Sequence, residues 1–176
     1  TLSVNNADMV ISRDSVWKYL DDGTKLDDVQ WTTLDYDDSQ WESGPAELGY
    51  GDGDEATAVN KGGSVSKTHN TIYFRRHFTL KSVNRGDRLL LELLRDDGAV
   101  VYLNGTEIIR SNMPSGTVLY STMATAKNNL KQSQLWHSHV IDSPSIKKGE
   151  NVIAVEVHRF NKWDRNLSFN LELGLL

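Results

Sequence analysis

Two adjacent aspartates interrupt an apolar run in the middle of the chain. Asp96 and Asp97 stand within "LLLELLRDDGAVVYLNGTEII", residues 89–109, just before a second apolar segment. Calcium binds six to eight oxygen atoms, and two carboxylates where a strand meets a loop can supply several of them. Asn112 follows the same stretch and could add an amide oxygen. The pattern therefore predicts a calcium site formed by Asp96, Asp97 and Asn112.

The same pair also has a purely structural interpretation. In a β-bulge or an Asx turn, Asp96 would accept backbone N–H bonds and Gly98 would supply a positive φ. Nothing in the residue types separates this interpretation from the calcium site, so both stay open.

A glycine-rich acidic loop precedes the pair. "GYGDGDEAT" places Asp52 and Asp54 at alternate positions, as in many calcium loops, but the full spacing of an EF-hand is missing. The loop is a second candidate for metal binding, and a plain acidic loop is the alternative.

The loop "RFNKWDRN" carries the third candidate site. An aromatic face can stack on the apolar face of a sugar ring, so Trp163 between charged residues is typical of a sugar site. Asp164 and Arg165 could form hydrogen bonds with sugar hydroxyls. Asn161 and Asn166 flank them, and the supporting residues predicted for the same end are His158, Arg95 and Arg110. An exposed Trp163 would favour binding, whereas a buried one would indicate a hydrophobic lid.

Short alternating segments, bounded by Gly, Asn, Asp and Ser, must position these residues. "TIYFRRHFTL" and "NVIAVEVHRF" alternate as strands with one face in a core, and "DRLLLELL" is apolar on both faces. Asn104-Gly105 predicts a tight hairpin turn. One helical turn is expected at "DDSQW", and long loops are expected at residues 49–70, 112–134 and 161–166. The pattern predicts an all-β antiparallel sandwich, residues 1–176 forming one domain.

Composition narrows the classes of partner. The 176 residues carry 19 Lys and Arg against 24 Asp and Glu, a net charge of −5. That balance argues against nucleic acid or an anionic membrane as partner, because both need a basic surface. The chain has no cysteine, which excludes disulfides, thiolate metal sites and cysteine nucleophiles.

Five stretches, taken in order, resemble galactose-binding-like jelly-roll modules appended to bacterial secreted enzymes and surface proteins: "SVWKYLDDGT", "WTTLDYDDSQWESGPAELGYGDGDEAT", "YFRRHFTL", "LLRDDGAVVYLNGTEIIRSNMPSG" and "GENVIAVEVH…LSFNLEL". The sugar-binding domain of glycoside hydrolase family 2 is similar in "DDS-x-W", "V-Y-L-N-G" and "G-x-N-x-I-A-V-x-V". The Asp96-Asp97 pair also resembles the calcium-holding pair of protective-antigen-type lectin domains.

The resemblance implies a jelly roll and a non-catalytic carbohydrate-binding module. Such a module is a secreted, extracellular monomer that uses calcium and targets a neighbouring catalytic domain to a polysaccharide or oligosaccharide. A spacer or adhesion domain without sugar affinity is the first alternative. A small polysaccharide-active enzyme using His137 and His139 or the acidic loop is the second. The sequence lacks a G-x-S-x-G elbow and a phosphate-binding loop, which gives catalysis little support.

Overall fold

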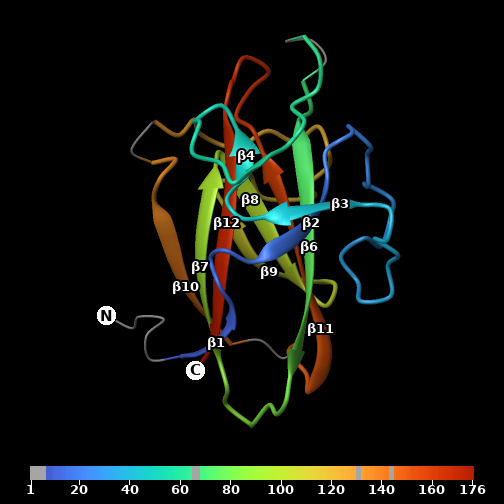
Figure 1. Cartoon of the computed structure of the whole chain (residues 1–176), viewed down its shortest axis with the longest axis vertical. Coiled ribbons are helices and arrows are strands. Elements are labelled where there is room, and N and C mark those ends of the chain that lie inside the picture. Colours follow the sequence, from blue (N-terminus) through green and yellow to red (C-terminus); the bar gives the residue numbers. More distant parts are fainter. Residues whose placement is uncertain (1–6, 65–67, 130–131, 143–144) are drawn as a thin grey trace.

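Two β-sheets face each other and enclose the core (Figure 1). The computed structural model describes residues 7–64, 68–129, 132–142 and 145–176, and within them there is no helix. Part of the predicted 112–134 loop, at 130–131, lies outside the described residues. The first sheet runs in the order β10 (Trp136–Ile141), β7 (Leu89–Asp96), β12 (Leu167–Leu175), β4 (Leu48–Tyr50) and β5 (Thr57–Ala58), and β1 (Asp8–Ile11) also pairs with β12.

The second sheet is antiparallel throughout. Its order is β3 (Glu42–Pro45), β2 (Val16–Leu20), β6 (Thr71–Leu80), β11 (Gly149–His158), β8 (Gly98–Leu103) and β9 (Thr106–Ser111). In the first sheet the short β4–β5 pair is parallel and the other pairs are antiparallel. The predicted all-β sandwich is confirmed, and the strand order is compatible with a jelly roll.

The alternation read from the sequence places the core correctly. On β6, Phe74 and Phe78 point between the sheets, while Tyr73 and Arg75 lie on the outer face. The apolar strand β7 is buried along its whole length, and β10 and β12 pair with its two edges. Side chains on the two inner faces therefore form one continuous apolar layer.

A second apolar cluster covers the outer face of the second sheet. Trp31 and Trp41, from the segment between β2 and β3, pack there on Tyr73. The predicted helical turn at residues 37–41 is wrong, since this stretch forms only a tight turn in which the Trp41 amide donates to the Asp38 carbonyl at 3.0 Å. Asp38 instead pairs with the buried Arg75 at 2.8 Å, which holds the segment flat against the sheet.

The predicted Asn-Gly hairpin joins β8 and β9. Asn104 has a φ of 50° and Gly105 a φ of 87°, the two positive values that this tight turn requires. The turn returns β9 beside β8, so that Ser111 lies opposite Ala99. This brings the segment after β9 back to the beginning of β8, next to the aspartate pair.

The aspartate pair lies where the chain crosses between sheets. β7 ends at Asp96 in the first sheet and β8 begins at Gly98 in the second, so Asp97 is the residue between them. Gly98 does not have the positive φ expected from the sequence. A glycine is needed there because a Cβ would lie 2.6 Å from the Met113 sulfur and 2.8 Å from the Asn112 carbonyl oxygen.

The loops around the crossover lie at one end of the sandwich, and the pairing of β1 with the end of β12 lies at the other. The segments that follow β4, β9 and β11 gather at the top of Figure 1, around the crossover. At the bottom, β1 pairs with the last residues of β12, and Asp8 lies opposite Leu175. No helix in the described part of the chain is long and apolar enough to cross a membrane.

Candidate functional site

Asp97 joins two loops to the crossover. Its side chain is buried, with 2% of the residue exposed. One carboxylate oxygen accepts the Asn128 backbone N–H at 2.8 Å, and the other accepts the Phe160 backbone N–H at 2.7 Å. Because the two amides come from the segments after β9 and after β11, a single carboxylate fixes both loops at this end of the sandwich.

Arg95 and two asparagines extend this network. The Arg95 guanidinium donates to the Asp97 carbonyl at 2.5 Å and to the Asn128 side-chain oxygen at 3.0 Å. Asn112, which has a φ of 55°, donates to the Asp97 carbonyl at 3.0 Å and exchanges side-chain hydrogen bonds with the backbone of Ala126. Arg95 and Asn112 thus hold the loop backbone. The sequence had predicted a ligand contact for Arg95 and a metal contact for Asn112.

Asp96 is the more unusual member of the pair. Only 1% of the residue is exposed, and one carboxyl oxygen accepts from the Asn166 side chain at 2.5 Å. The other oxygen is buried and has no N–H or hydroxyl donor among the described residues. The Asp96 and Asp97 carboxyls also interact with each other, and two carboxyls can share a hydrogen bond only when one of them carries a proton.

Burial is the main reason why the pKa of Asp96 rises to about 8, and the adjacent charge of Asp97 adds to it. Burial also raises the pKa of Asp97, but there the two backbone N–H donors act in the opposite direction. The proton shared by the pair therefore belongs on Asp96, while Asp97 keeps the charge that its amide donors stabilise.

The predicted calcium ligands are largely engaged with the protein. Both oxygens of Asp97 accept backbone N–H groups, and the Asn112 side-chain oxygen accepts the Ala126 amide at 3.1 Å. The oxygen without a donor is on Asp96. The Asn166 side chain links Asp96 to Asp52, because it donates a hydrogen bond to each of them. Within the described ranges, no group of three His, Cys, Asp or Glu is arranged to hold a metal.

Trp163 is the most exposed large apolar side chain at the loop end. The residue is 66% exposed, and the Lys162 ammonium lies 5.0 Å above the ring. The loop is held from beneath, because the Trp163 and Asp164 amides bond back to Asn161 and the Asp164 carboxylate pairs with Lys127 at 2.5 Å. A loop closed by its own hydrogen bonds thus presents an exposed aromatic ring, as the sugar-binding interpretation expects.

A cleft of about 710 Å³ lies on one side of this loop. It runs between the β4–β5 loop, the segment after β9 and the end of the β11–β12 loop. Its lining residues carry amides and charges of both signs, but their carbon atoms form the larger part of the lining surface. This mixture of apolar surface and a few polar groups is typical of small-molecule sites. The lining residues are Gly51, Asp52, Lys127, Asn128, Asn129, Arg165 and Asn166.

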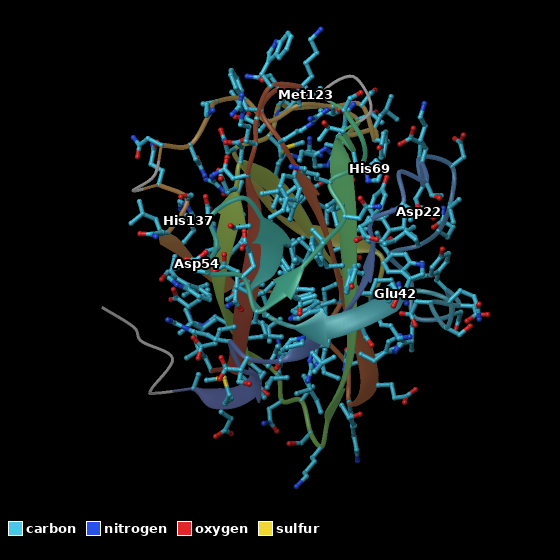
Figure 2. All side chains as sticks on the ribbon, turned by 45° about the horizontal axis from the view of Figure 1, so that its top comes forward. Asp22, Glu42, Asp54, His69, Met123 and His137 are labelled. Carbon is cyan, nitrogen blue, oxygen red and sulfur yellow. The ribbon has the colours of Figure 1, made fainter. Side chains whose placement is uncertain are left out.

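Two smaller cavities continue around the other side of the loop. Trp163 and Arg165 line a cavity of about 330 Å³, together with Lys61 and Lys162. Lys162 and Thr68 also line the next cavity, of about 560 Å³, beneath which Arg159 is buried. Figure 2 labels three residues of this last cavity, with Met123 at the top of the view and His69 and Asp22 on its right-hand side.

Several predicted ligand contacts are placed elsewhere by the structure. His158 is fully buried and bonded to Thr71 and the Thr122 carbonyl, so it cannot touch a ligand. Arg110 binds Glu107 and two loop carbonyls. Asp54 is exposed and makes no hydrogen bond with the described residues. Asp164 lines the cavity beside Trp163, although its carboxylate is paired with Lys127. The predicted residues that the structure does bring to the clefts are Trp163, Asp164, Arg165, Asn166 and Asp52.

Sequence reasoning missed Lys127, Asn128 and Arg159. Each depends on a partner far away in the chain, such as Asp164 for Lys127 and Asp97 for Asn128. Arg159 could have been noticed as the cation that directly follows a buried strand, but its burial depends on loops contributed by Thr68 and Asn70.

The chain matches no protein-family profile and no curated protein. Its fold is similar to solved glycosidases. A β-glucuronidase of glycoside hydrolase family 2 matches 96% of this chain with a TM-score of 0.59 at 18% identity. A β-glycosidase from Bacteroides vulgatus matches 94% with a TM-score of 0.51 at 20% identity. A β-glucuronidase from Ruminococcus gnavus, in complex with D-glucuronic acid, matches 97% with a TM-score of 0.56 at 16% identity.

These similarities establish the β-sandwich fold and concern only a part of each enzyme. The matched region is 18%, 20% and 30% of the three glycosidase chains. At identities this low, the similarity shows the fold alone and does not identify a ligand.

Proposed function

We propose that this chain is a non-catalytic carbohydrate-binding module that targets a larger secreted enzyme to a polysaccharide. The observation that carries the proposal is Trp163, an aromatic ring that is 66% exposed on a loop closed by its own hydrogen bonds, with a cleft on each side. Stacking on the ring would orient a sugar, and Arg165, Asn166 and Asp52 would bond its hydroxyls. The likeness to segments of glycosidase chains supports a role beside a catalytic domain.

Trp163→Ala is expected to weaken polysaccharide binding at least tenfold, since truncating an aromatic anchor typically costs about 2 kcal/mol. Affinity electrophoresis in gels containing single polysaccharides, followed by calorimetry, measures the change. The unfolding midpoint should stay unchanged because the side chain is exposed.

Met9→Ala is the matched control, because Met9 is 49% exposed on β1 at the opposite end. Equal retardation of the wild type and Trp163→Ala would contradict the proposal. Wild-type protein that binds no glycan would support a spacer domain, and turnover of a polymeric substrate would support an enzyme.

Calcium at the Asp96–Asp97 pair stays a prediction, and it has its own test. If the pair holds calcium, EDTA lowers the thermal unfolding midpoint of the wild type and leaves that of Asp96→Ala unchanged. The oxygen of Asp96 that has no donor supports a metal, whereas the two amides on Asp97 support a structural role. Identical wild-type midpoints in calcium and in EDTA would exclude the metal.

A further inference from the structure

Arg159 is a buried cation with no carboxylate partner among the described residues. The residue is 2% exposed and directly follows β11. Its guanidinium donates to neutral oxygens only, at the Lys162 carbonyl (3.3 Å), the Thr68 carbonyl (3.0 Å) and the Asn70 side chain (2.8 Å). The third nitrogen, Nε, has no acceptor among the described residues.

The other buried arginines of the described chain are compensated differently. Arg75 pairs with Asp38 at 2.8 Å, and Arg95 lies in the field of Asp96 and Asp97. Asp164 is the acidic group whose charge reaches Arg159, but Asp164 already pairs with Lys127. A buried charge held by neutral oxygens alone is costly, so Arg159 is the one of the three that an incoming anion would compensate.

The cavity above Arg159 is cationic although the whole protein is acidic. Lys25, Arg159 and Lys162 line this cavity of about 560 Å³, and Asp22 is the acidic residue in its wall. Within the described ranges, no carboxylate lies at salt-bridge distance from any of the three cations. Like charges brought together without counterions create a positive potential that attracts an anion.

This cavity continues into the surface that carries Trp163. Lys162 and Thr68 line both this cavity and the smaller one beside Trp163. The Lys162 ammonium, 5.0 Å above the Trp163 ring, stands at the boundary. A sugar ring stacked on Trp163 could therefore place a charged substituent, its own or that of the next residue, next to Lys162 and Arg159.

We propose that the module binds an acidic glycan, and that the cavity formed by Lys25, Arg159 and Lys162 receives a carboxylate or sulfate substituent of the chain while Trp163 stacks on a ring. This inference rests on the proposed carbohydrate-binding function and specifies its ligand class. Nucleic acid fits less well, because a net charge of −5 opposes a continuous polyanion whereas one local cavity accepts a single anionic group.

The test compares matched glycans on the intact chain by calorimetry. The probes are oligogalacturonate, its methyl ester, a sulfated galactan oligosaccharide and the corresponding neutral galactan oligosaccharide. We expect at least one acidic probe to bind at least tenfold more tightly than its uncharged counterpart. The preference should shrink in 0.5 M NaCl, because salt screens charge interactions at a partly exposed site. The esterified and sulfated probes show whether the anion is a carboxylate or a sulfate.

The double variant Lys25→Gln and Lys162→Gln should abolish the preference for the acidic probe over its uncharged counterpart. Both lysines are exposed, so folding is expected to be retained. Lys147→Gln with Lys148→Gln is the matched control, since it removes the same charge before β11 at the other end of the molecule. Equal binding of charged and uncharged probes, unaffected by the lysine variants, would overturn the acidic ligand and leave sugar binding intact. Wild-type protein that binds none of a broad glycan panel would contradict the proposed function and this inference together.

Discussion

Asp97→Ala is expected to destabilise the protein by about 3 kcal/mol or more. The substitution removes two hydrogen bonds to a charged acceptor and leaves the buried amides of Asn128 and Phe160 without a partner. Both loops of the candidate site should loosen before the core does, since their shared anchor is lost. Urea unfolding gives the free energy, and hydrogen exchange of the two amides locates the effect.

Two further variants make this result specific. Asp97→Asn keeps one acceptor oxygen and should show an intermediate loss. Asp54→Ala removes an exposed carboxylate without hydrogen bonds to the described residues, and should change the stability by less than about 0.5 kcal/mol. If Asp97→Ala were as mild as Asp54→Ala, the carboxylate would not be what holds the two loops.

The stability of the metal-free protein is expected to fall as the pH rises from about 4 to about 8. Asp96 has a pKa of about 8 in the folded protein, chiefly because it is buried, against 3.8 for an unhindered aspartate. Between these values the folded state binds a proton that the unfolded state has lost, so the free energy of unfolding falls as the pH rises. The destabilisation caused by burying Asp96 is absent below pH 4 and complete above pH 8. Between these values the free energy of unfolding falls by at most about 1.4 kcal/mol per pH unit.

Asp96→Asn isolates this contribution. An amide can accept from Asn166 as Asp96 does and can donate to the Asp97 carboxylate, so it imitates the protonated acid. In EDTA, the variant should match the wild type near pH 4 and be more stable at pH 8, as measured by urea unfolding across the range. A difference between the two proteins that does not change with pH would show that Asp96 is ionised throughout.

The sequence predicted the framework because local patterns encode it. Alternation on "TIYFRRHFTL" distinguishes Phe74 from Tyr73, and the Asn104-Gly105 pair specifies a turn with two positive φ values. The error at residues 37–41 arose where tertiary contact overrode local preference, since Asp38 pairs with Arg75 on a distant strand instead of beginning a helix.

The candidate site was harder to predict because its residues are tied across the chain. The sequence identified the aspartate pair, but not that Asp97 holds two loops while Asp96 retains a proton. The exposure of Trp163 follows from the loop's own hydrogen bonds and from Lys127, which no local pattern links to Asp164. Charges that are compensated at long range leave no mark in a single sequence.

The pairing of β1 with the end of β12 has a mechanical consequence. Asp8 lies opposite Leu175, so the beginning of β1 and the end of β12 lie side by side. In a longer chain held at both ends, tension would pull these antiparallel strands apart from one end and break their hydrogen bonds one after another. Force would therefore first separate the four-residue strand β1 from β12, at the end of the sandwich opposite the β11–β12 loop. The fold would then open first at β1, while the loops of the candidate site stayed folded.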